Sequence, residues 1–94
     1  MTTHKHYAVS EVSGEHVGVL RIPTNDGKVL EKDIRSAIEK CLEEHFDTEV
    51  EVPEGLPESL FKMYGDDPEE ITVKLPTLGT EERVSVAHSW LYTP

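Results

Sequence analysis

The residues of this chain best suited to chemistry are its five histidines, its single cysteine and its many carboxylates. His4 and His6 form an H-x-H pair, which has the spacing of two metal ligands on one side of a strand. With a two-residue hairpin turn, His16 pairs opposite Glu11. His6 then pairs opposite Arg21 at the far end of the hairpin, too distant for His16 to be a third ligand. We therefore expect no metal site there.

Cys41 and His45 lie four residues apart and would share one side of a helix. Such a pair could begin a zinc site or a Cys–His nucleophile. Cys41, however, lies in an apolar helical stripe, where a thiol behaves as a small hydrophobic group of low reactivity. The chain has no second cysteine to complete a ligand set. We expect Cys41 to be structural.

The remaining candidates for chemistry give weaker signals. His88 alternates with apolar residues, which indicates a half-buried histidine with a hydrogen-bond partner. Carboxylate pairs are abundant, as in any acidic chain, and a small domain leaves little depth for a catalytic pocket. The chain has no G-x-G-x-x-G, P-loop, G-x-S-x-G or C-x-x-C motif. We expect no catalytic residue, metal ligand or cofactor; the alternative is a small metal-dependent or hydrolytic enzyme that uses the acidic residues.

Hydrophobic periodicity predicts the elements that must position these groups. Residues 7–12 and 16–22 are rich in strand-forming residues and flank a Ser-Gly turn, which predicts a β-hairpin. Gly18, inside the second strand, indicates a bulge or a close approach to the backbone. Residues 28–46 carry apolar side chains at spacings of three and four, which predicts an amphipathic helix.

The second half of the chain predicts shorter elements. Residues 48–52 alternate polar and apolar side chains, which indicates a short strand that Pro53 closes. Residues 57–65 have the pattern of one or two helical turns. Residues 71–75 and 83–92 predict two further strands.

The predicted element order is β-β-α-β-(short α)-β-β. A length of 94 residues fits one domain over 1–94, with residues 1–5 frayed. We expect an α+β fold of two layers, in which the helix over about 28–46 covers one face of a mainly antiparallel sheet. The last strand is a candidate sheet edge through which two copies form a homodimer.

The formal net charge of −10 excludes several classes of partner. Phosphate contacts need clustered Lys and Arg, so we expect neither direct nucleic-acid binding nor attachment to anionic membranes. No apolar run approaches the roughly 18 residues of a membrane span, and residues 1–7 lack the apolar stretch of a signal peptide. A single cysteine cannot form an internal disulfide. These features predict a cytoplasmic protein.

The whole net charge lies in residues 43–70, which carry eleven acidic residues and one lysine. One interpretation is a solvated face that keeps the domain soluble. The other is a recognition surface for a basic protein, including an acidic nucleic-acid mimic that inhibits a basic DNA- or RNA-binding protein. The candidate acidic interaction surface consists of Glu49, Glu51, Glu54, Glu58, Asp66, Asp67, Glu69 and Glu70.

Trp90 and Tyr92 form a second candidate contact, because aromatic side chains are enriched at protein interfaces. The alternative is that these rings complete the core. Taken together, the sequence favours a small non-enzymatic domain that acts through a protein–protein contact, as an interaction or accessory module.

Overall fold

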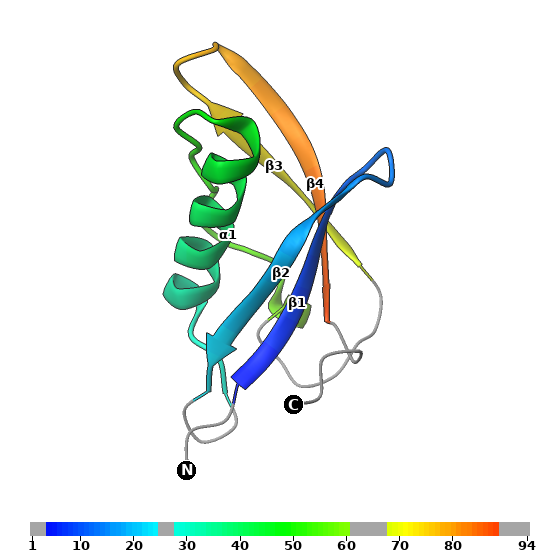
Figure 1. Cartoon of the computed structure of the whole chain (residues 1–94). Helices are drawn as coiled ribbons and strands as arrows, with labels where there is room; N and C mark the ends of the chain where they lie inside the picture. The colour runs from blue at the N-terminus through cyan, green and yellow to red at the C-terminus, as the bar shows by residue number, and fades with distance from the viewer. Residues whose placement is uncertain (1–3, 25–27, 61–67, 89–94) are drawn as a thin grey trace.

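The computed structural model describes residues 4–24, 28–60 and 68–88 (Figure 1). The elements in chain order are β1 (His4–Glu11), β2 (His16–Pro23), α1 (Glu31–Phe46), the 3-10 turn η1 (Glu58–Leu60), β3 (Glu69–Leu75) and β4 (Thr80–His88). The four strands form one antiparallel sheet in the order β2-β1-β4-β3, and α1 covers one of its faces (Figure 1). This architecture confirms the predicted two-layer α+β fold.

The β1–β2 hairpin follows the predicted register along most of its length. His6 lies opposite Arg21, as expected from a short turn. The register shifts beyond the Val9–Gly18 pair, so that Ser10 rather than Glu11 faces His16. One extra residue on β2 produces this shift, which is the definition of a β-bulge. The bulge lies directly beside Gly18, where the sequence indicated an irregularity.

The boundaries of β1 and α1 differ from the predicted ones. β1 already begins at His4, so the expectation of fraying over residues 1–5 is wrong for His4 and Lys5, because backbone pairing with β2 orders them. The helix begins at Glu31 rather than near residue 28. The chain before it is extended and buries Val29, and the Leu30 carbonyl accepts the first helical hydrogen bonds.

The predicted strand over 48–52 is reduced to a single β-bridge between Glu51 and Lys74 of β3. Two backbone hydrogen bonds of 2.8 and 2.9 Å make this bridge, and Val50 and Val52 are buried as predicted. Pro53 has no N–H to donate and therefore limits further pairing. The predicted helical turn is present as η1, and residues 61–65 of that prediction lie outside the described residues.

β4 corrects the expectation that the last strand is a sheet edge. It lies between β1 and β3 and hydrogen-bonds to both, because its alternating side chains supply Val84 and Val86 to the centre of the core. β4 begins at Thr80, earlier than predicted, and residues 89–92 of the predicted strand lie outside the described part of the chain.

The core lies between α1 and the sheet. From α1 it receives Ile34, Ile38 and Leu42, the apolar stripe that the periodicity predicted. From β1 it receives Tyr7, which is fully buried and whose hydroxyl donates a hydrogen bond to the Leu60 carbonyl. The half-buried His88 ring lies beside the Tyr7 ring, at 4.9 Å between centroids.

Burial of Tyr7 predicts a loss of stability at alkaline pH. Burial raises the pKa of Tyr7 to about 12, whereas a tyrosine in an unfolded chain ionises at about 10. The unfolded state therefore releases this proton first, so the stabilisation is complete below about pH 10 and is lost as the pH rises towards about 12. We expect the free energy of unfolding, measured in urea across this range, to fall more steeply for the wild type than for Tyr7→Phe. Equal pH slopes would contradict the prediction.

Candidate functional site

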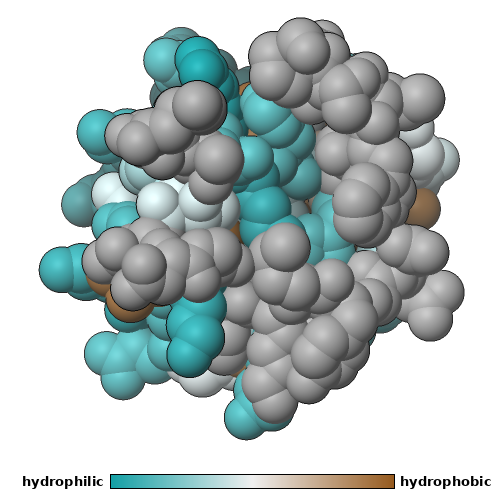
Figure 2. All heavy atoms as spheres, turned by 90° about the horizontal axis from the view of Figure 1, so that it is seen from below, coloured by the Kyte–Doolittle hydropathy of each residue, from teal (hydrophilic) through white to brown (hydrophobic). Residues whose placement is uncertain are grey.

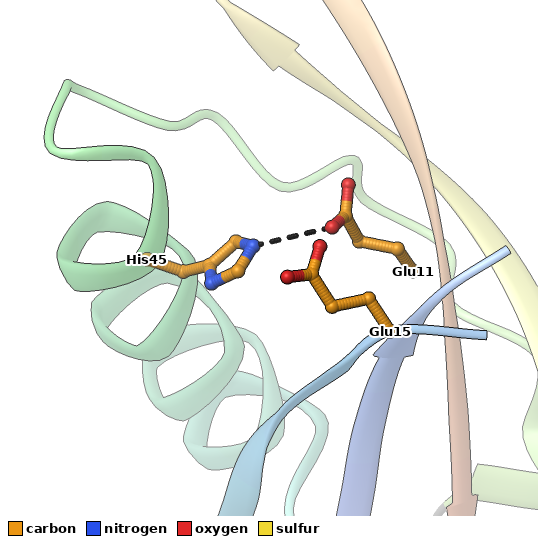
Figure 3. A group of neighbouring side chains, drawn as sticks. All are labelled: Glu11, Glu15 and His45. Atoms are coloured by element: carbon orange, nitrogen blue, oxygen red, sulfur yellow. Dashed lines mark ion pairs between the residues drawn. The ribbon is translucent and has the colours of Figure 1, made fainter. Parts of the chain in front are cut away.

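Three side chains that can bind a metal ion converge where α1 ends over the β1–β2 turn (Figure 3). Glu11 ends β1, Glu15 lies in the turn and His45 lies in the last turn of α1. The ligand atoms of this Glu11–Glu15–His45 triad all lie within 4.8 Å of one another. His45 Nε2 is 3.5 Å from Glu11 Oε2, and both side chains remain about a quarter exposed.

The hairpin turn holds the two carboxylates of the triad together. The Glu11 N–H donates to the Glu15 carbonyl at 2.8 Å, and the Gly14 N–H donates to the Glu11 carbonyl at 2.8 Å. Gly14 has a φ of +104°, which a residue with a Cβ rarely adopts. This backbone geometry places both glutamates on one short turn.

The length of α1 brings the His45 side chain back to the β1–β2 turn. α1 has 16 residues, which span roughly 24 Å at ~1.5 Å per residue. β2 has eight residues, which span roughly 26 Å at ~3.3 Å per residue. The chain runs away from the turn along β2 and returns along α1, so the end of the helix lies level with the turn. The triad was missed in the sequence, although this comparison of lengths was the signal that could have found it.

The two carboxyl groups of the triad interact strongly. A hydrogen bond with Glu15 lowers the pKa of Glu11, and the neighbouring His45 lowers it further. The same hydrogen bond and the negative charge of Glu11 raise the pKa of Glu15. The pair therefore competes for one proton, and a cation placed between the carboxylates could take the place of that proton.

A groove between β2 and α1 is the second notable feature of this side of the molecule. Among the described strands β2 pairs only with β1, so that no described strand pairs with its other backbone edge. Two adjoining hollows of about 530 and 240 Å³ follow this edge and share Arg21, Ala37 and Lys40. The larger hollow also contacts His45, so the groove reaches the triad. We call this feature the β2–α1 groove; its lining includes Gly18, Arg21, Ala37, Lys40, Cys41 and His45.

Gly18 of β2 and Cys41 of α1 lie in close contact in the groove. A Cβ on Gly18 would lie 3.0 Å from Cys41 Sγ, closer than ordinary van der Waals contact. The close approach that Gly18 indicated in the sequence is thus present. Burial, and to a lesser extent Glu44, raise the pKa of the half-buried Cys41 thiol, which keeps it protonated at neutral pH. These features fit the expected structural cysteine.

The described part of the candidate acidic interaction surface lies partly at β3, the sheet edge opposite β2, and partly on the chain that follows α1. Glu51 is exposed and its backbone pairs with β3, whereas the Glu70 side chain on β3 accepts a hydrogen bond of 2.9 Å from Arg83. Glu49 and Glu54 are exposed on the chain between α1 and η1, Glu58 is exposed at the start of η1, and Glu69 is partly exposed at the start of β3. Asp66 and Asp67 lie outside the described residues, as do Trp90 and Tyr92.

Large exposed hydrophobic side chains are scattered over the described surface. Val12 lies in the β1–β2 turn, Leu30 precedes α1 and Leu78 lies in the β3–β4 turn. Figure 2 shows that the described residues visible at one end of the molecule are mainly hydrophilic. No helix in the described ranges is long and apolar enough to cross a membrane. The triad and the β2–α1 groove are therefore the two candidate sites.

We compared the chain with models of known protein families, with curated proteins and with solved structures, and none of them matches it.

Proposed function

We propose that this chain is a cytoplasmic, non-enzymatic interaction module that binds an extended peptide segment of a partner protein along the β2–α1 groove. The observation that carries the proposal is the edge of β2 with which no described strand pairs, and which lies beside the two adjoining hollows. A cytoplasmic location agrees with the single free cysteine.

Strand addition is the binding mode that this edge supports. An extended peptide can join a sheet edge through backbone hydrogen bonds, while pockets beside the edge select alternate side chains. β2 is eight residues long, which is more than enough for such pairing. The other edge strand, β3, is already bridged by Glu51. An exposed edge without cover otherwise promotes aggregation, which gives β2 a reason to have a partner.

The groove favours a peptide with an acidic side chain and a small or medium apolar one. Lys40 and Arg21 line both hollows, whereas Asp33 and Glu44 each line only one. The exposed Lys40 can therefore pair with a carboxylate of the peptide. Ala37 is a small residue on the same lining and leaves room for an apolar side chain beside the close Gly18–Cys41 contact. A second copy of the chain is a less suitable occupant, because two copies of net charge −10 repel each other.

Selection of peptides on the immobilised full chain tests this proposal. We expect selection from a random peptide library to yield extended acidic peptides. Their binding to the full chain is then measured by fluorescence polarisation. Lys40→Glu should weaken their binding by about tenfold or more, because it replaces attraction by repulsion inside the groove. Lys74→Glu is the matched control: it changes the net charge equally, at an exposed site on β3, and should change affinity by less than about twofold.

Two outcomes would contradict the proposal. One is equal weakening by both substitutions, which would show that only the overall charge matters. The other is selection of basic peptides that Lys40→Glu does not affect, which would favour the acidic interaction surface near β3. Sedimentation equilibrium of the free protein tests the remaining alternative, because a stable dimer that Lys40→Glu disrupts would assign the groove to self-association.

A further inference from the structure

We infer that the Glu11–Glu15–His45 triad is a binding site for a zinc-class divalent cation that clamps the end of α1 to the β1–β2 turn. This inference does not rest on the proposed function, although His45 belongs to both the triad and the lining of the β2–α1 groove. It rests on the convergence of three ligands of suitable type from a strand end, a turn and a helix. None of these ligands is a neighbour of His45 in the sequence, so the fold itself assembles the set.

The distances in the triad fit a tetrahedral ion. Zinc lies about 2.0–2.2 Å from imidazole nitrogen and carboxylate oxygen, so tetrahedral ligands lie roughly 3.4 Å from one another. His45 Nε2 and Glu11 Oε2 are 3.5 Å apart. The Glu15 ligand atom lies within 4.8 Å of both, and Glu15 is exposed, so its side chain is free to turn toward the other two ligands. Figure 3 shows the three side chains pointing toward one another.

The charges of the site also suit a cation. Two carboxylates on one turn repel each other unless a proton or a positive ion lies between them. An ion bound there would satisfy both carboxylates and the imidazole together. The ligand set has one nitrogen and two carboxylate groups, a mixture that suits zinc and related transition-metal ions better than Ca²⁺ or Mg²⁺, which prefer oxygen ligands alone. Three protein ligands leave a fourth position for water.

The site is reachable and partly preorganised. His45 lines the larger hollow of the β2–α1 groove, which opens to solvent. Its ring also packs edge-on against Phe46, with 4.8 Å between centroids, which restricts ring rotation. The turn hydrogen bonds of Glu11 keep the two carboxylates adjacent before any ion binds. Little ordering is therefore needed at the moment of binding.

Isothermal titration of the full chain with zinc chloride tests the inference. We expect one ion per chain, and weaker binding by about tenfold or more for His45→Gln and for Glu15→Gln. Both substitutions keep a side chain of similar size and hydrogen-bonding capacity at a surface position, so the fold should persist, which circular dichroism checks. Zinc should raise the melting temperature of the wild type but not of His45→Gln, because the ion joins two separate elements.

Two control variants keep the test specific for the triad. His16→Gln removes an exposed histidine next to Glu15 in the chain and should leave the zinc affinity unchanged. A double variant, His4→Gln with His6→Gln, removes the H-x-H pair, which lies at the other end of β1. If zinc binds His45→Gln as tightly as the wild type, or if the double variant abolishes binding, the inference is wrong. Equal or tighter binding of calcium would also overturn the assignment of ion class.

Discussion

Leu42→Ala is expected to lower the free energy of unfolding by about 2–5 kcal/mol. Leu42 lies in the last part of the apolar stripe of α1 and is 0% exposed. Its removal costs the transfer free energy of the lost carbons and leaves a cavity that the rigid sheet beneath cannot fill. In a chain of this size such a loss is a large part of the total stability.

The matched control for this prediction is Leu78→Ala. It deletes the same side chain at a position in the β3–β4 turn that is 60% exposed. We expect it to change the free energy of unfolding by no more than about 0.5 kcal/mol. Urea denaturation monitored by circular dichroism compares the two variants directly. Similar losses in both would show that α1 does not pack on the sheet as described.

Gly18→Val is expected to destabilise the protein by about 1–3 kcal/mol through overpacking. Valine has a much higher strand propensity than glycine, so propensity alone predicts that Gly18→Val stabilises the protein. We expect the close contact to outweigh propensity and make the substitution destabilising. A Cβ at Gly18 would lie only 3.0 Å from Cys41 Sγ, and valine adds two further carbons. The strand or the helix must shift to accommodate them.

Substitution of the opposing cysteine separates the clash from other effects of valine. In a Cys41→Ala background the sulfur is absent, and we expect Gly18→Val to cost at least about 1 kcal/mol less than in the wild-type background. A double-mutant cycle measured by urea denaturation gives this coupling energy. If the cost of Gly18→Val is the same in both backgrounds, the close approach of β2 and α1 at this point is not what limits the side chain.

The elements governed by local patterns could be predicted from the sequence. The spacing of Ile34, Ile38 and Leu42 identified the buried face of the helix, and all three are fully buried. The Ser-Gly turn set the hairpin register, which placed His6 opposite Arg21 correctly. These features depend on neighbours within one or two turns of chain, where periodicity and turn chemistry are informative.

The features that depend on pairing between distant segments could not be predicted in this way. Nothing local to residues 80–88 shows that β4 lies between β1 and β3, and the bridge at Glu51 depends on where β3 lies. The Glu11–Glu15–His45 triad needs both the hairpin turn and the direction in which α1 packs on the sheet. In the sequence His45 is near only its helical neighbour Cys41, whereas its proximity to Glu11 and Glu15 arises from the fold.

The central place of β1 in the sheet has a consequence for the order in which the protein can fold during synthesis. β1 is made before the other described elements, and its hairpin with β2 can form while the later ones are still being synthesised. Its other edge pairs with β4, where Tyr7 lies opposite His88, so it stays open until nearly the whole described chain has emerged. The nascent chain must therefore keep this strand edge unpaired while residues 12–88 are synthesised, which makes chaperone contact or rapid synthesis of β4 important for the yield.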